Sequence, residues 1–96
     1  MLTNNLEMLK RGSREGFAIP AINTQGGQYD IIRACTKAAQ EMRSPIILAH
    51  YVSTGAYSGH DWFVETAKWC ANKVDVPVSI HLDHGDGFPI CMEALR

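Results

Sequence analysis

Short apolar runs alternate along the chain with longer stretches in which apolar residues recur every three or four positions. The apolar runs predict strands over residues 16–23, 44–50 and 76–83. The periodic stretches predict helices, because that spacing places the apolar side chains on one helical face. The expected helices cover residues 4–15, 28–43, 60–74 and 87–96, and residues 53–61 are expected to form a loop.

One leading helix followed by three strand–helix units predicts an α/β fold with parallel strands. Parallel neighbours need long crossovers, and these are almost always right-handed. Both an open doubly wound sheet and a closed eight-stranded barrel have this alternation of strands and helices. The segment after the first strand reads "NTQGGQYD" and lacks the GxGxxG spacing of a dinucleotide-binding turn.

Composition and charge exclude several functional classes. The 96 residues are 46% hydrophobic and carry a net charge of −1, so we expect one small domain with neither nucleic acid nor a membrane as partner. The N-terminus lacks a signal-peptide pattern. The three cysteines are widely spaced, which favours buried, reduced thiols and a cytoplasmic location.

Polar residues follow each expected strand, at the end where parallel α/β folds carry their chemistry. They are Asn23, Thr24 and Gln25, then His50, Tyr51 and Ser53, and finally His81, Asp83 and His84. An aspartate between two histidines at a strand end is costly without partners. Its purpose is either metal binding with general-base catalysis or structural hydrogen bonding. His60 is expected to be a surface residue at a helix start.

The spacing within "HLDHG" predicts which side chains share a face of the strand. His81 and Asp83 lie on one strand face by the two-residue period, so His81 is expected to orient its neighbour. His84 would reach the same target only if the alternation relaxes at the strand end, where Gly85 and Gly87 are expected to free the backbone.

The segments "FAIPAIN", "AAQEMRSPIILA" and "VPVSIHLDHG" resemble, in order and spacing, the N-terminal part of class II, zinc-dependent ketose-bisphosphate aldolases. The resemblance covers the whole chain and implies a TIM-type (β/α)8 barrel. Residues 1–96 would then be the leading helix and the first three units of an incomplete barrel domain, truncated on its C-terminal side. A complete barrel has about 250 residues.

The resemblance also implies roles for particular residues. His84 would be one zinc ligand, Asp83 the catalytic base, and Asn23 a substrate contact. The family often has a small hydroxyl residue after the second strand, and Tyr51 stands there with Ser53 close by. Those two residues are therefore the expected substrate contacts at that place.

The implied activity is reversible cleavage of a ketose 1,6-bisphosphate, fructose or tagatose, to dihydroxyacetone phosphate and glyceraldehyde 3-phosphate, using Zn²⁺. The complete enzyme would be a homodimer or homotetramer. Two alternatives stay open: another metal-dependent barrel enzyme such as a hydrolase, or a non-catalytic truncated fragment. The isolated 96-residue chain is expected to be inactive, because further zinc ligands and the phosphate-binding loops would lie outside it.

Overall fold

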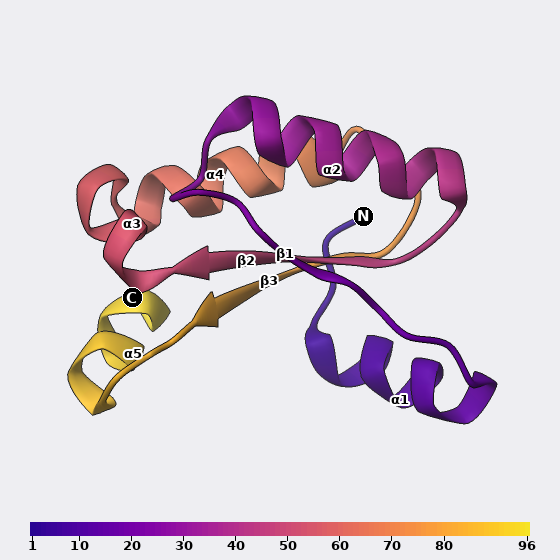
Figure 1. Cartoon of the computed structure of the whole chain (residues 1–96), viewed down its shortest axis with the longest axis horizontal. Coiled ribbons are helices and arrows are strands. Elements are labelled where there is room, and N and C mark those ends of the chain that lie inside the picture. The colour runs from indigo at the N-terminus through magenta and orange to yellow at the C-terminus, as the bar shows by residue number, and fades with distance from the viewer.

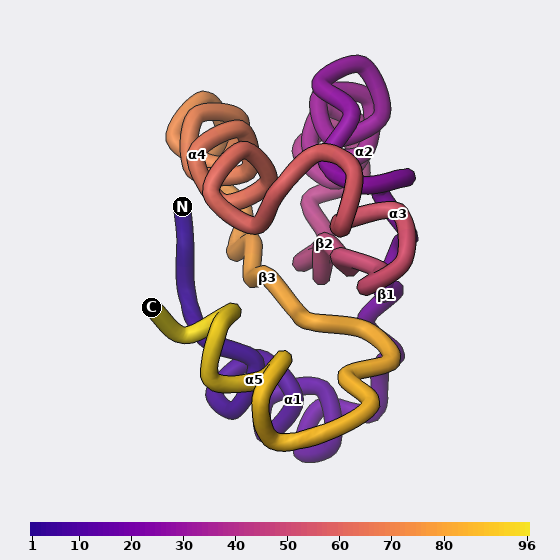
Figure 2. The backbone as a smooth tube through the Cα atoms, turned by 90° about the vertical axis from the view of Figure 1, so that its left-hand side faces the viewer, coloured from indigo at the N-terminus to yellow at the C-terminus, as the bar shows by residue number.

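The computed structural model describes residues 1–96 and contains three parallel strands and five helices. In chain order the elements are α1 (Asn5–Glu15), β1 (Ala21–Asn23), α2 (Tyr29–Met42), β2 (Ile46–Tyr51), α3 (Val52–Ser58), α4 (His60–Ala71), β3 (Val78–Asp83) and α5 (Phe88–Leu95). The strand order is β1-β2-β3. Helices α2 and α4 cover one face of the sheet, whereas α1 and α5 lie on the other side (Figures 1 and 2). No helix is long and apolar enough to cross a membrane.

The first helix begins and ends where the sequence predicts. The Asn4 side chain accepts a hydrogen bond of 3.0 Å from the Glu7 N–H, which caps the helix. Gly16 ends it with a φ of +76°, a left-handed conformation that glycine adopts without steric cost. The side chain of Ser79 donates to Asn5, so α1 lies against the sheet face opposite α2 and α4.

The first strand is shorter than predicted, because only Ala21–Asn23 pair with β2. Pro20 has no N–H to donate and contributes only its carbonyl, which accepts from Ile47 N at 2.9 Å. Phe17 is turned back towards α1, since its N–H donates to Gly12.

The predicted loop at residues 53–61 is wrong: Val52–Ser58 form α3. Serine and glycine are poor helix formers, so local propensity gives no sign of this helix. Tertiary contacts stabilise it instead. Gly55 is buried against the His50 ring, and the Ser58 hydroxyl donates to the Gly26 carbonyl.

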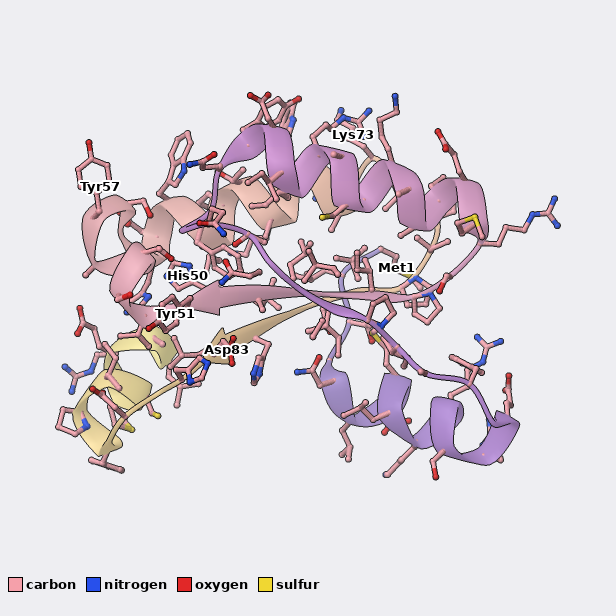
Figure 3. The ribbon with its side chains drawn as sticks, in the orientation of Figure 1. Met1, His50, Tyr51, Tyr57, Lys73 and Asp83 are labelled. Carbon is pink, nitrogen blue, oxygen red and sulfur yellow. The ribbon has the colours of Figure 1, made fainter.

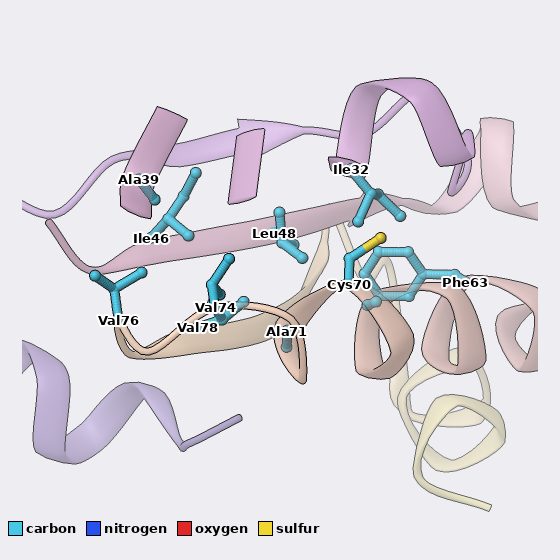
Figure 4. Close-up of a cluster of buried hydrophobic side chains, with 11 residues drawn as sticks. Ile32, Ala39, Ile46, Leu48, Phe63, Cys70, Ala71, Val74, Val76 and Val78 are labelled. Atoms are coloured by element: carbon cyan, nitrogen blue, oxygen red, sulfur yellow. The ribbon is translucent and has the colours of Figure 1, made fainter. Parts of the chain in front are cut away.

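The hydrophobic core fills the space between the sheet and helices α2 and α4 (Figure 4). It comprises Ile32, Ala39, Ile46, Leu48, Phe63, Ala67, Cys70, Ala71, Val74, Val76 and Val78. Strand β2 is buried on both faces, as its continuous apolar run predicts. The core therefore holds the carboxyl ends of the strands on a packed scaffold.

The cysteines bear out the expected burial only in part. Cys70 is fully buried, Cys35 is half-buried and Cys91 is exposed. Cys91 lies on α5, in which no residue is buried. All three thiols are free, and burial raises the pKa of Cys35 and of Cys70.

Shortening the central core side chain, Leu48→Ala, is expected to lower the free energy of unfolding by about 3 kcal/mol. Leu48 is fully buried in the middle of β2, so its removal leaves a cavity. Chemical denaturation measures the effect, with Met42→Ala as the control because Met42 is 76% exposed. Equal losses in the two variants would contradict the packing described here.

Candidate active site at the strand ends

The register of the sheet brings most of the predicted site residues onto one surface. Asn23 pairs with Ala49, which pairs with His81, and Tyr51 pairs with Asp83. Residues paired in a parallel sheet point to the same face, so these side chains form two neighbouring rows. The rows lie on the face opposite α2 and α4, because Leu48 and Val78 point into the core on the other side. Figure 3 shows Tyr51 and Asp83 together at the carboxyl end of the sheet.

The Asp83 carboxylate lies between two imidazole rings. Its Oδ1 is 3.8 Å from His81 Nε2, and its Oδ2 is 3.9 Å from His84 Nε2. Both separations are longer than a hydrogen bond, so the carboxylate oxygens retain lone pairs that are free to accept a proton. The side chain is 37% exposed and accessible to a ligand. His81 lies on the same strand face as Asp83, as the two-residue period predicts.

The turn that redirects the chain after β3 is made by His84 itself. Its φ is +55°, in the left-handed region, whereas Gly85 and Gly87 lie outside that region and Gly87 is extended. The expectation that the glycines would make this turn is therefore wrong. A left-handed conformation costs a non-glycine residue about 1 kcal/mol, and such costs concentrate at functional sites. As a result, the His84 ring lies beside Asp83, with 74% of its side chain exposed.

Tyr51 completes the contact across the strand ends. Its ring meets the His84 ring edge-on, with centroids 5.2 Å apart and an interplanar angle of 73°. Tyr51 is the last residue of β2 and the N-cap residue of α3. The position of this aromatic ring therefore depends on α3.

Asn23 and Ser53 have different surroundings. The Asn23 Oδ1 accepts from Gln25 N at 2.8 Å, which leaves the Asn23 amide nitrogen free to donate to a ligand. Ser53 is exposed on the first turn of α3, and its side chain makes no hydrogen bond. Thr24 is buried, and its hydroxyl donates to the Ala49 carbonyl, so its role is structural.

Two histidines lie elsewhere than the sequence predicts. His50 is 2% exposed and stacks on Phe63 on the helix-covered face, away from Asp83. His60 is half-buried rather than on the surface, and its Nδ1 lies 3.0 Å from His50 Nε2. Sequence reasoning missed this pair because the helix that brings its members together was itself missed.

The chain has donors for only part of a metal site. No group of three histidine, cysteine, aspartate or glutamate side chains is close enough to hold a metal ion. A catalytic zinc normally has three protein ligands and one open position. The His84 imidazole suits one of those places, because it is exposed and its Nε2 makes no hydrogen bond.

Three parallel strands joined by crossover helices, with polar residues at their carboxyl ends, define an α/β segment of the kind found in barrel and doubly wound folds. The family model described as "Fructose-bisphosphate aldolase class-II" matches residues 3–96. The chain belongs to the class II fructose-bisphosphate aldolase family.

Curated relatives match along the entire chain. It is 35% identical over 96 residues to a fructose-bisphosphate aldolase of Thermus caldophilus, covering 100% of this chain and 30% of the relative. It is 38% identical over 101 residues to that of Mycoplasma pneumoniae, covering 100% of this chain and 33% of the relative. The chain thus spans about a third of the length of these relatives.

Among solved structures, the YdjI aldolase from Escherichia coli K12 has a similar fold. The TM-score is 0.85 at 24% identity, over 99% of this chain and 35% of that chain. The expected fold class is confirmed: the three strand–helix units form part of a TIM-type barrel.

Proposed function

We propose that these residues supply part of the active site of a zinc-dependent aldolase. The reaction is reversible cleavage of a ketose 1,6-bisphosphate, fructose or tagatose, to dihydroxyacetone phosphate and glyceraldehyde 3-phosphate. One observation carries the proposal: the Asp83 carboxylate lies between His81 and His84 at the carboxyl ends of the strands, within 3.9 Å of both rings and without a hydrogen bond. Family membership makes this chemistry the best-supported use of that arrangement.

In this proposal Asp83 is the base. Its carboxylate takes the proton from the C4 hydroxyl, the C3–C4 bond breaks, and C4 becomes the carbonyl of glyceraldehyde 3-phosphate. The electron pair of the broken bond stays on C3 of the other half, which becomes dihydroxyacetone phosphate when C3 takes up a proton from an acid outside these 96 residues. In the reverse direction Asp83 returns the same proton. His81, 3.8 Å from Oδ1, keeps the carboxylate turned towards the substrate.

His84 would hold the zinc ion through an imidazole nitrogen, together with ligands from outside these 96 residues. When bound, zinc supplies Lewis-acid polarisation of the substrate carbonyl. Asn23 would donate to the substrate through its amide nitrogen, which the hydrogen bond to its Oδ1 leaves free. Tyr51 and Ser53 would contact it from the second strand end, where Tyr51 introduces a larger side chain than a serine.

Several wider properties belong to the same proposal. The complete enzyme works in the cytoplasm as a homodimer or homotetramer, without nucleic acid or membrane partners, and its small-molecule partner is the phosphorylated ketose. The 96-residue chain by itself is inactive, because it lacks a complete donor set. Its sheet also has an unpaired outer edge along β1, which favours association with other chains.

The test is an assay of the protein as its gene encodes it. Coupled detection of both triose phosphates is expected with fructose or tagatose 1,6-bisphosphate, and removal of the metal by a chelator should abolish turnover until zinc is returned. Purified residues 1–96 should show no turnover. Cleavage that resists chelation but is lost on borohydride reduction with substrate would contradict the proposal, because it would indicate a lysine Schiff base.

A further inference from the structure

His50 and His60 form a hydrogen-bonded pair of imidazoles behind the strand ends. His50 Nε2 lies 3.0 Å from His60 Nδ1, and the rings meet edge-on with centroids 5.0 Å apart. His50 also stacks on Phe63 at 4.3 Å, and its Nδ1 is buried without a partner. Figure 3 labels His50 on the helix-covered side of β2, with Asp83 on the other side. The pair therefore lies on the face of the sheet opposite Asp83, although His81 lines the same cavity.

The pair joins the two ends of α3. His50 precedes Val52–Ser58 by two residues, and His60 follows it by two. The helix rests on the His50 ring at Gly55, where an added methyl group would overlap the imidazole. The hydrogen bond between the rings thus closes the segment around α3.

Helix α3 in turn connects the three strand ends. Tyr51, its N-cap residue, ends β2 and contacts the His84 ring beyond β3. At its other end, the Ser58 hydroxyl donates to the Gly26 carbonyl, in the turn that follows Asn23 and β1. A shift of α3 would therefore displace Tyr51.

We propose that the His50–His60 pair is a proton-sensitive clasp that holds α3 in place and so positions Tyr51 beside His84. The clasp itself does not depend on the catalytic proposal. Only the effect of Tyr51 on a bound substrate rests on the catalytic proposal.

Protonation breaks the clasp for a simple reason. One hydrogen atom lies between the two ring nitrogens, so a neutral or singly charged pair keeps the bond. When both rings are charged, all four nitrogens carry hydrogens and none accepts.

Burial, and then the neighbouring His60, lower the pKa of His50. When the clasp opens, His50 loses these surroundings and returns to the ordinary histidine pKa of about 6.5. The clasp is therefore fully effective above that pH and weakens as the pH falls below it.

Other titratable groups lie near the pair without bonding to it. His81 of β3 and Cys91 of α5 line the same cavity of about 490 Å³ as the two rings, whereas α2 places no titratable side chain there. Asp61 of α4 accepts from Trp62 N, and Tyr57 of α3 is 98% exposed. None makes a hydrogen bond or ion pair with His50 or His60, so the pair itself should set the pH response.

Hydrogen exchange of residues 52–58, followed by mass spectrometry in the protein as its gene encodes it, tests the clasp. His60→Leu removes one partner of the hydrogen bond between the rings. His60→Gln keeps an amide group that can accept from or donate to His50 Nε2 but does not titrate. Tyr57→Ala is the control on α3. At pH 7.5, after correction for intrinsic rates, these amides are expected to exchange roughly tenfold faster in His60→Leu than in the wild type. In His60→Gln and in Tyr57→Ala they are expected to exchange at the wild-type rate.

At pH 5 wild-type exchange should approach that of the Leu variant, whereas the Gln variant stays protected. Unchanged protection in His60→Leu at pH 7.5, or the same pH dependence in wild type and His60→Gln, would overturn the proposal. Should the Leu variant fail to fold, the comparison of wild type with His60→Gln decides alone. Since exchange is measured without substrate, absence of aldolase activity would leave this result standing.

Discussion

Replacing the base, Asp83→Ala, is expected to lower kcat of the complete enzyme by about a thousandfold while zinc stays bound. The magnitude is that of a general base, whose removal costs about 10²–10⁴ in rate. The carboxylate is the one acidic group in contact range of both His81 and His84, and its oxygens are not engaged in hydrogen bonds. Steady-state kinetics together with metal analysis measure the effect.

Asp86→Asn is the matched control for the lost charge. Asp86 is exposed two residues beyond His84 and makes no ion pair. Asp86→Asn removes one negative charge, as Asp83→Ala does, but leaves the proposed base in place. Turnover of Asp83→Ala within a few-fold of wild type would show that this carboxylate is not the base.

The second large effect is expected from His84→Ala, which should release the metal and abolish activity. A catalytic zinc with one of three protein ligands removed loses most of its affinity. Metal content after dialysis measures the loss. His81→Asn is the comparison for metal content, because His81 faces Asp83 rather than an open donor position and should retain zinc. Full zinc occupancy in His84→Ala would contradict the assignment of His84 as a ligand.

The sequence predicts the scaffold well because its elements are locally encoded. Asn4 and Gly16 mark the ends of α1, and the apolar run of β2 is buried as predicted. The relative placement of His81 and Asp83 also follows from local geometry, since alternate strand residues share a face. The direction of His84 does not, because it depends on a left-handed φ that a non-glycine residue rarely adopts.

What the sequence missed depends on contacts between distant segments. Helix α3 contains Ser53 and Gly55, and it forms because it packs on His50 and bonds to Gly26. His50 lies at the end of β2 next to Tyr51. Because adjacent strand residues point to opposite faces, His50 points to the helix-covered face and Tyr51 to the face that carries the site. Its pairing with His60 needs α3 to be in place, so no local pattern indicates it.

The most direct test of the account is the position of zinc, measured by anomalous diffraction from crystals of the complete protein. We predict a zinc peak about 2.0–2.1 Å from an imidazole nitrogen of His84, with the Asp83 oxygens outside the coordination sphere and facing the substrate cavity. A peak remote from His84, or zinc bound by Asp83 in place of His84, would contradict the central claim.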